Sequence, residues 1–301
     1  MRQPRVAVVG AVNVDICGRP HQKLILRDSN PGAVRYTPGG VGRNIAHDLC
    51  LLGEGVRFVT VFGEDANGDA LRQSCAALGM DLSCAETVPG MRTSTYLYIT
   101  DEHGEMQLAL SDTDISGCIT PDFLAQRLEA INSMDVVVAD GNLTEETLVW
   151  LGEHITPPLF VDPVSVTKAE RLRPMLHRIH TFKPNLTEGQ HLTGWTKPED
   201  VVEALLASGV RRVFLSLGAD GILAGEGDAR VYLPCYPTRL VNTTGGGDAV
   251  MAAIIWSFLH GRNLAESVSA ALRAGKAAVE YDGTNNPALC ADLLENAAGT
   301  D

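Results

Sequence analysis

The segment from Val241 to Gly261, VNTTGGGDAVMAAIIWSFLHG, constrains the fold and the chemistry of this chain more than any other. It reads as a strand end, a run of glycines, an aspartate and an apolar helix, and Gly261 suits the left-handed position after the last turn. The first N–H groups of a helix have no partner within the helix, and glycines let the preceding turn point its own N–H groups the same way. Gly245, Gly246 and Gly247 are therefore predicted to form an anion site at a positive helix end.

Asp248 directly follows these glycines. Its carboxylate would lie beside a bound phosphate, where it can take a proton from a hydroxyl that attacks phosphorus. An acidic residue in the first turn of a helix also has a simpler use, because it stabilises the helix dipole. The segment by itself leaves both interpretations open.

Composition narrows the class of protein. A chain of 301 residues can form one large α/β domain, and 24 basic against 37 acidic residues give a formal charge of −13, which argues against a nucleic-acid partner. The 7 cysteines contain no C-x-x-C pair and are typical of free thiols in a reducing cytosol. We find no signal peptide and no apolar run long enough to span a bilayer, so we expect a cytoplasmic protein with no membrane partner.

Strand-like and helix-like segments alternate, which predicts a doubly wound, mostly parallel sheet flanked by helices in a single domain over residues 1–301. The apolar run from Arg5 to Val12 is typical of a buried central strand. It ends at Asn13 and Asp15, which we expect at the ligand-binding edge of the sheet, although a plain turn uses the same residues. Gly10 has no companions at G-x-G-x-x-G spacing, which argues against a dehydrogenase.

Further elements follow the same pattern. We predict strands over 56–62, 135–139, 159–161, 180–182 and 213–217, and helices over 67–78, 144–154 and 264–281. Asp140 and Asp162 end two of these strands at the ligand edge, where either can also cap a helix.

Two segments, at about 16–36 and 93–110, fall outside this alternation. Their short pieces, 23–26, 33–36, 93–100 and 105–110, predict a small four-stranded sheet that stands off the main body.

Between these pieces lies TPGGVGRNIAHDLCLLG, which predicts an amphipathic helix from about Val41. Gly39 and Gly40 would let a ligand approach the backbone, and Asn44 offers a donor and an acceptor to a pair of ribose hydroxyls. A tight turn between a strand and a helix would give the same pattern.

Asn185 and Glu188 stand three residues apart on a predicted helix. Their side chains can converge on a metal-bound phosphate through water, yet the same spacing is that of a capping box. The later SLGADG, from Ser216 to Gly221, reads from its residues as a turn into a hairpin.

Taken in order, these motifs resemble those of the ribokinase-like carbohydrate kinases, the phosphofructokinase B family. The GGGD run is similar to the second signature of that family, with a glycine at the usual alanine position. GGVGRN is similar to the first signature, although Val41 replaces the usual lysine and Arg43 stands before Asn44, so the acceptor need not be a simple pentose. The spacing of Asn185 and Glu188 matches the N-x-x-E motif of these kinases.

The resemblance implies a ribokinase-like fold in which the small sheet is a lid over the acceptor and pairs two subunits in a homodimer. It implies ATP and Mg²⁺ as cofactors, with K⁺ as a further expectation. It assigns Asp248 as the base and Gly245, Gly246 and Gly247 as the anion hole. The other implied roles are acceptor binding by Asn13, Asp15, Gly39, Gly40, Asn44, Arg43 and Ser29, nucleotide binding by Asn185, Ser216, Gly218 and Gly221, Mg²⁺ at Glu188 through water, and a monovalent cation at Asn242 and Thr244. The loop from Asp282 to Pro287 is expected to border adenine.

Within this family, the segments DSNPG, TPGGVGRN, VDPVS, HTFKPN and TNNP are most similar to the bacterial pseudouridine kinases. That likeness implies transfer of the γ-phosphate of ATP to the 5′-hydroxyl of pseudouridine. The alternatives are another nucleoside such as uridine or inosine, a free sugar such as ribose, a non-catalytic ligand-binding regulator, and a nicotinamide-dependent oxidoreductase.

Overall fold

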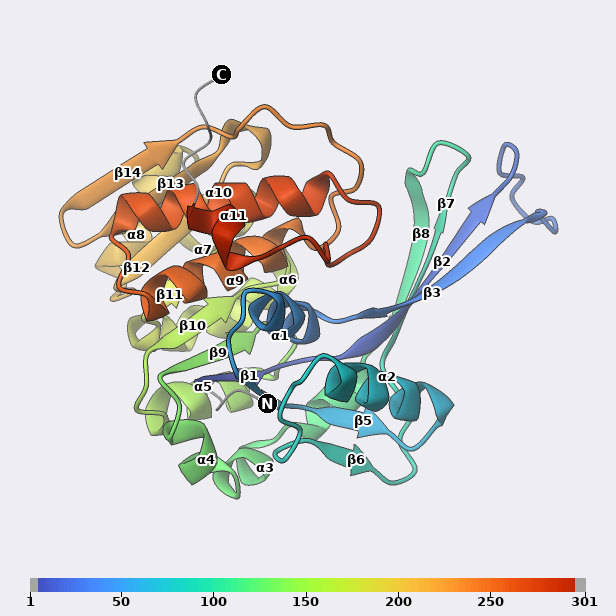
Figure 1. Ribbon diagram of the computed structural model, residues 1–301, viewed down its shortest axis with the longest axis horizontal. Coiled ribbons are helices and arrows are strands. Elements are labelled where there is room, and N and C mark those ends of the chain that lie inside the picture. The colour runs from blue at the N-terminus through green and yellow to red at the C-terminus, as the bar shows by residue number, and fades with distance from the viewer. Residues whose placement is uncertain (1–4, 296–301) are drawn as a thin grey trace.

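An eight-stranded sheet in the order β14-β13-β12-β11-β10-β9-β1-β4 forms the body of the protein (Figure 1). The computed structural model describes residues 5–295. The strands from β4 to β12 along this order pair in parallel, and β13 and β14 add an antiparallel edge. The strands are β1 (Val6–Val9), β4 (Val56–Val59), β9 (Val136–Asp140), β10 (Leu159–Asp162), β11 (Thr181–Phe182), β12 (Arg212–Ser216), β13 (Ile222–Glu226) and β14 (Ala229–Leu233).

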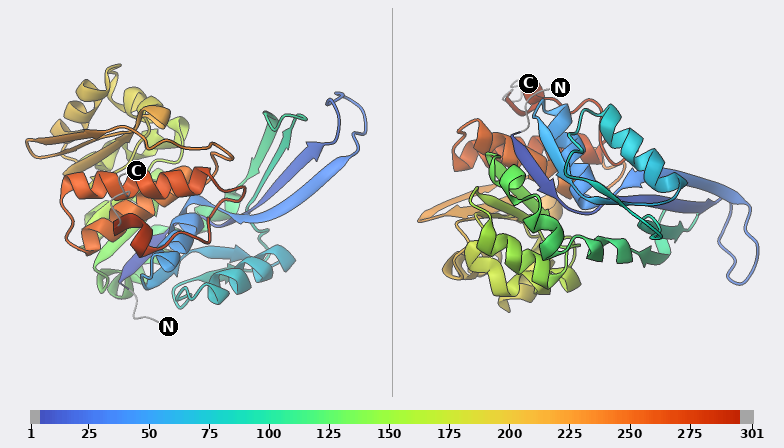
Figure 2. Two further views of the ribbon diagram at one scale, coloured as in Figure 1. Left: turned by 45° about the horizontal axis from the view of Figure 1, so that its top comes forward. Right: turned by 90° about the horizontal axis from the view of Figure 1, so that it is seen from below.

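Helices cover both faces of this sheet (Figure 2). They are α1 (Val41–Leu51), α2 (Ala66–Ala77), α3 (Pro121–Ala125), α4 (Leu128–Asn132), α5 (Glu145–His154), α6 (Val166–Ala169), α7 (Leu186–Thr193), α8 (Pro198–Ala207), α9 (Gly246–Leu259), α10 (Leu264–Val279) and α11 (Ala291–Glu295), with 3₁₀ turns η1 (Asp114–Cys118), η2 (Glu170–Arg178) and η3 (Gly218–Asp220). A short parallel pair, β5 (Val61–Gly63) and β6 (Glu86–Val88), lies beside α2.

Alternation along the strands divides the apolar interior in two. Val6 and Val8 belong to a core shared with α1, α9 and α10, whereas Ala7 and Val9 belong to a second core shared with α3, α5 and α8. Because successive strand residues point to opposite faces, a nearly continuous apolar run is what a sheet covered on both sides requires. The predicted doubly wound, mostly parallel sheet is confirmed.

The small sheet has the order β3-β2-β7-β8 and projects away from the body (Figure 1). Its strands are β2 (Asn13–Pro20), β3 (Gly32–Gly39), β7 (Thr95–Thr100) and β8 (Met106–Asp112). The predicted strand at 23–26 is wrong, because Asn30 holds that segment as a turn: its side chain accepts from the backbone N–H of Ile25 and donates to the backbone carbonyl of Ile25. Pairing of β2 with β3 stops at Pro20, a residue that has no backbone N–H to donate.

Two predicted strand ends also lie elsewhere. The strand predicted to run to Val12 ends at Val9, and Asn13 and Asp15 begin β2, so they lie at the base of the small sheet rather than in a turn. The strand expected before the central glycines is absent from the described chain, since β14 ends at Leu233 and a loop fills 234–244. Prolines in that loop favour irregular structure.

The long helix α9 is the most buried helix of the body, and its apolar residues meet both α1 and α10. It begins after Gly245, whose φ of 81° is left-handed, and ends before Gly261 at φ 64°. Both glycines therefore sit where the sequence predicts them. Of the helices in the described part of the chain, none is both long and apolar enough to cross a membrane.

Candidate active site

The turn before α9 can be made only by glycine at its first position. A Cβ on Gly245 would lie 2.1 Å from the carbonyl oxygen of Thr284. Gly246 and Gly247 then open α9, and a Cβ on Gly247 would lie 3.4 Å from the Nζ of Lys183. The positive end of a long helix and a lysine ammonium thus meet at one place, as an anion site requires.

Asp248 stands in the first turn of α9, and its side chain is buried. The Nδ2 of Asn44 on α1 donates to its Oδ2 at 2.9 Å. Burial and the neighbouring carboxylate of Asp162 raise the pKa of Asp248 well above that of an ordinary aspartate, while Asn44 and Lys183 act in the opposite direction. A raised pKa makes the ionised carboxylate a stronger proton acceptor, which is the property that a general base needs.

Lys183 and Asp162 form a buried ion pair at the ends of neighbouring parallel strands. Their Nζ and Oδ2 atoms lie 3.0 Å apart. Burial alone would lower the pKa of Lys183, but the carboxylates of Asp162, Glu188 and Asp248 raise it, so the ammonium is held charged beside the glycine turn. Lys183 was not among the residues predicted from the sequence to act in the site, although its place directly after a predicted strand was a usable signal.

The second glycine turn joins β3 to α1, and Asp15 packs against it. A Cβ on Gly39 would lie 2.3 Å from the Oδ2 of Asp15, and Gly40 has a φ of 97° with a would-be Cβ 2.5 Å from the carbonyl oxygen of Ala11. Asn13 donates a hydrogen bond to the Asp15 carboxylate. Burial raises the pKa of Asp15 to about 6, against the opposing effects of Asn13 and Arg43.

Asp140 stabilises this turn through hydrogen bonds to its backbone. Its Oδ2 accepts from the backbone N–H groups of Ala11 at 2.9 Å and Gly42 at 2.8 Å, and its Oδ1 accepts from Asn142 at 2.8 Å. A carboxylate so fully used by backbone donors holds the start of α1 against the end of β1, so its role is structural.

Asn185 and Glu188 form the capping box that was the alternative to a metal site. The backbone N–H of Glu188 donates to Asn185 Oδ1 at 2.9 Å, and that of Asn185 donates to Glu188 Oε2 at 2.8 Å. Glu188 is nevertheless buried beside Lys183, and burial raises its pKa. The cap uses one carboxylate oxygen, so the second oxygen stays available and the two interpretations do not exclude each other.

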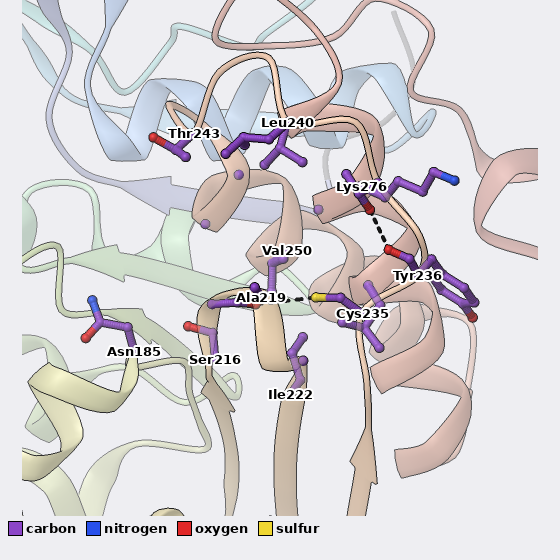
Figure 3. A pocket seen from close by; sticks show the side chains of 18 of the residues that line it. Asn185, Ser216, Ala219, Ile222, Cys235, Tyr236, Leu240, Thr243, Val250 and Lys276 are labelled. Atoms are coloured by element: carbon purple, nitrogen blue, oxygen red, sulfur yellow. Dashed lines mark hydrogen bonds between the residues drawn. The ribbon is translucent and has the colours of Figure 1, made fainter. Parts of the chain in front are cut away.

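A cavity of about 690 Å³ opens beside the first turn of α9 (Figure 3). Asn185 and Ser216 lie at one end, and Tyr236 and Lys276 lie at the other. Its polar groups are few and its walls are mainly apolar, which is typical of a site for a small organic molecule. The lining residues are Lys183, Asn185, Ser216, Gly218, Ala219, Gly221, Ile222, Cys235, Tyr236, Pro237, Thr238, Leu240, Thr243, Gly246, Gly247, Val250, Leu272, Gly275, Lys276 and Val279.

The remaining predicted residues are placed less favourably. Ser29 is exposed in the loop between β2 and β3, at the end of the small sheet that points away from the body (Figure 1). Asn242 donates to the carbonyl of Asp282 in the loop after α10 and accepts from the N–H of Thr244 in its own loop, so both ends of its amide are used. The loop from Asp282 to Pro287 is not among the residues that line this cavity, and its expected place beside adenine stays a prediction.

The two glycine turns, the buried carboxylate of Asp248 and the adjoining cavity are the features that a phosphotransferase needs, and the fold is ribokinase-like. The chain belongs to the pfkB family of carbohydrate kinases, whose model matches residues 3–290. It is therefore an ATP-dependent kinase, and the nicotinamide-dependent alternative is set aside.

Particular relatives agree with this class. The chain is 39% identical to the pseudouridine kinase of Escherichia coli (strain K12) over 97% of both chains. It is also similar to a solved carbohydrate kinase from Agrobacterium tumefaciens, at 26% identity and a TM-score of 0.86 over 97% of this chain and 96% of that one. The fold matches an Arabidopsis thaliana ribokinase solved with ribose and ATP, at 21% identity and a TM-score of 0.85 over 98% of this chain and 100% of that one.

Proposed function

We propose that this kinase phosphorylates the 5′-hydroxyl of a nucleoside, and that pseudouridine is its preferred acceptor. The observation that carries the proposal is the position of Asp248, a buried carboxylate fixed by Asn44 where the start of α9 meets the start of α1. The identity of 39% to a pseudouridine kinase supports the choice of acceptor.

The residues divide the reaction between them. Asp248 takes the proton of the acceptor hydroxyl while its oxygen forms a bond to the γ-phosphorus of ATP and the bond to the bridging β,γ-oxygen breaks, which releases ADP. The N–H groups at Gly246 and Gly247, with the ammonium of Lys183, stabilise the negative charge on the transferred group.

Other residues bind the two substrates. Asn13, Asp15 and the turn at Gly39 and Gly40 hold the ribose, and Arg43 supports them through its hydrogen bond to Asn44. Ser29, exposed at the far end of the small sheet, is given no contact with the acceptor in this proposal. Ser216, Gly218 and Gly221 contact the nucleotide.

The protein side chains near the glycine turn could supply only some of the ligands that a Mg²⁺ ion needs. Within residues 5–295, no three or more His, Cys, Asp or Glu side chains gather as a metal cage. Glu188 with Asn185 would hold the ion through water, and its charge would offset that of the phosphates. A K⁺ ion at Asn242 and Thr244 fits less well because the Asn242 oxygen already accepts a backbone N–H, and the proposed reaction involves no such ion.

A substrate panel tests the proposal. ADP release is measured with pseudouridine, uridine, inosine and ribose, and we expect the highest kcat/KM with pseudouridine. A higher value with another acceptor would overturn the choice of substrate but not the kinase class. The absence of turnover with every acceptor would favour the non-catalytic regulator.

An exposed apolar face of the small sheet favours a homodimer. Residues that are paired across neighbouring strands lie on the same face of a sheet. On one face of the small sheet, the paired residues are apolar. This apolar face consists of Ile16, Val34, Tyr36, Leu97, Ile99, Leu108 and Leu110. Val34, Tyr36, Leu108 and Leu110 are each more than half exposed, which is unusual for neighbouring large apolar side chains in a monomer. We propose that a second copy of the chain covers this face.

The opposite face of the same strands provides a matched control for the dimer. Leu110→Glu places a charge in the apolar face, whereas Ser111→Glu places it one residue along β8 on the other side, where Ser111 is also exposed. Sedimentation should show a monomer for the first variant and a dimer for the second. A monomeric parent protein at micromolar concentration would contradict the proposal.

The setting proposed for the enzyme is the cytoplasm. All 7 cysteines are free thiols, which suits a reducing compartment that also supplies ATP. The formal charge of −13 would repel the phosphate backbone, so we do not propose nucleic acid as a partner.

A further inference from the structure

Asn285, in the loop after α10, makes three hydrogen bonds to α1. Its Oδ1 accepts from Arg43 Nη1 at 2.7 Å, and its Nδ2 donates to the backbone carbonyl of Asn44 at 3.1 Å and to Asp48 Oδ1 at 2.9 Å. A single amide more than 230 positions away in sequence thus satisfies side chains on both sides of Asn44. Both Arg43 and Asp48 are buried, so these bonds replace water that neither group can reach.

The contact with Arg43 decides which way the Asn44 amide points. Arg43 Nη1 also donates to Asn44 Oδ1 at 3.2 Å, and Asn44 Nδ2 donates to Asp248 Oδ2 at 2.9 Å. If the amide were rotated by half a turn, its oxygen would face the Asp248 carboxylate and repel it, while its nitrogen would face the arginine. The guanidinium therefore selects the orientation that supports the base, and Asn285 holds the guanidinium.

The same loop also contacts the start of α9. The carbonyl of Thr284 fills the space that a side chain on Gly245 would need, and the carbonyl of Asp282 accepts from Asn242. Residues 282–287, the bridging loop, thus join the two helix starts that carry Asn44 and Asp248. A loop fixed at both helices can keep their separation constant.

We propose that Asn285 is a positioning residue for the catalytic centre: it holds Arg43, and through Arg43 and Asn44 it sets the orientation of the Asp248 carboxylate. The inference rests on the proposed function only because turnover is one of its readouts. It assigns a task to the bridging loop other than contact with the nucleotide.

The next residue provides the control. Asn286 has the same chemistry and lies in the same loop, but its Nδ2 donates to the carbonyl of Ala277 on α10. We compare Asn285→Ala with Asn286→Ala, with rates normalised to the folded fraction. Asn285→Ala should lower kcat by roughly 10- to 100-fold with the KM for ATP almost unchanged, because misplacement of a catalytic group by a fraction of an ångström has effects of this order. Asn286→Ala should keep kcat within about twofold.

The pH profile separates positioning from a general loss of structure. The Asn44 bond lowers the pKa of Asp248, so its loss raises that pKa and moves the acid limb of kcat to higher pH in Asn285→Ala. Asp162 and Lys183, which also act on this carboxylate, keep their contacts in both variants. Asp48 loses its hydrogen bond from Asn285 in Asn285→Ala, but its effect on Asp248 is smaller than that of the Asn44 bond, which therefore sets the direction of the shift. Equal kcat values and equal acid limbs in the two variants would overturn the proposal.

A double-mutant cycle and crystal structures complete the test. If Asn285 acts through Asn44, then Asn44→Ala combined with Asn285→Ala should lose no more kcat than Asn44→Ala alone. Independent, multiplying losses would contradict the route. Crystal structures of the parent protein and of Asn285→Ala need no substrate, and the proposal requires that the Asn44 side chain leave Asp248 in the variant. If no acceptor is turned over, the proposed function fails, yet this structural comparison still decides the role of Asn285.

Discussion

The proposed acceptor half and the proposed nucleotide half of the site are built in different ways. Around the start of α1, the side chains of Asn13, Arg43 and Asn44 are at most 9% exposed. Asn13 donates to the Asp15 carboxylate, Arg43 donates to Asn44, and Asn44 donates to Asp248. Around the cavity proposed for the nucleotide, the loop at 234–244 contains no strand, and Leu240 and Val241 are 65% and 46% exposed. One half is a fixed polar network, and the other is an open, mainly apolar recess.

The difference follows from what each half must do. An acceptor hydroxyl has to be aligned to within a fraction of an ångström before phosphoryl transfer, which favours an arrangement formed in advance. A nucleotide base has to enter and leave in each cycle, and apolar walls with few polar contacts allow this. Charge for the phosphates is concentrated where the halves meet, at Lys183 and the glycine turn of α9.

Replacement of the base itself should have the largest effect. Asp248→Asn keeps an oxygen that can accept the Asn44 hydrogen bond, so folding and ATP binding should stay nearly intact. Turnover should fall by about 10²- to 10⁴-fold because the proton acceptor is lost. Steady-state rates and nucleotide titration measure the two quantities, and full activity of the variant would refute the role of the base.

Removal of the cation at the junction should affect stability as well as rate. Lys183→Met leaves Asp162 buried without its partner, which should lower the free energy of unfolding by about 3–5 kcal/mol. Addition of Asp162→Asn should restore most of that stability but not the turnover, because the phosphoryl group still lacks its ammonium. Denaturant unfolding and kcat together test this, and an active, stable Lys183→Met enzyme would show that the lysine is dispensable.

The metal side of the nucleotide half is tested by Glu188→Gln. The glutamine keeps an oxygen that can accept the Asn185 N–H, so the helix cap should persist and the loss of stability should not exceed about 1 kcal/mol. The Mg²⁺ concentration for half-maximal activity should rise about 10- to 100-fold, since the anionic oxygen is gone. An unchanged Mg²⁺ requirement would leave Glu188 as a capping residue alone.

The smallest effect concerns the protonation of Asp15 in the acceptor half. Its pKa is raised from 3.8 to about 6 by burial, so the protonated form is favoured in the folded state and the contribution of Asp15 to stability falls as pH rises between these values, then stays constant. The ionised form accepts acceptor hydroxyls, so binding measured by calorimetry without ATP should weaken by about tenfold per unit below about pH 6. Asp15→Asn should abolish that dependence, and a pH-independent parent protein would contradict it.

Much of the body could be predicted from local pattern. Apolar runs such as 136–139 and the glycines around α9 have a direct physical meaning, and each lies where it was expected. The strand order of the sheet depends on pairings between distant segments, and periodicity does not record such pairings. The turn at 23–26 was predicted as a strand because its side chains alternate, while the bonds from Asn30 that fold it are invisible in such a pattern.

In the site, too, the residues that local pattern marks could be predicted, whereas contacts between distant segments could not. Asp248 and Asn44 come shortly after glycines, a position that favours a functional role. In the structure, Asn44 Nδ2 lies 2.9 Å from Asp248 Oδ2. Lys183 and Asn285 were given no role because their importance depends on partners far away in sequence, Asp162 and the residues around Asn44. The capping box at Asn185 and Glu188, which the sequence offers as an alternative to a metal site, is present.

The most direct test of this account is a crystal structure of the protein with its best acceptor and a non-hydrolysable ATP analogue. The account predicts that the acceptor oxygen lies within about 2.6–3.2 Å of the Asp248 carboxylate, with the terminal phosphate on the N–H groups of the glycine turn. An acceptor bound with that oxygen away from Asp248, or a terminal phosphate away from the start of α9, would contradict it.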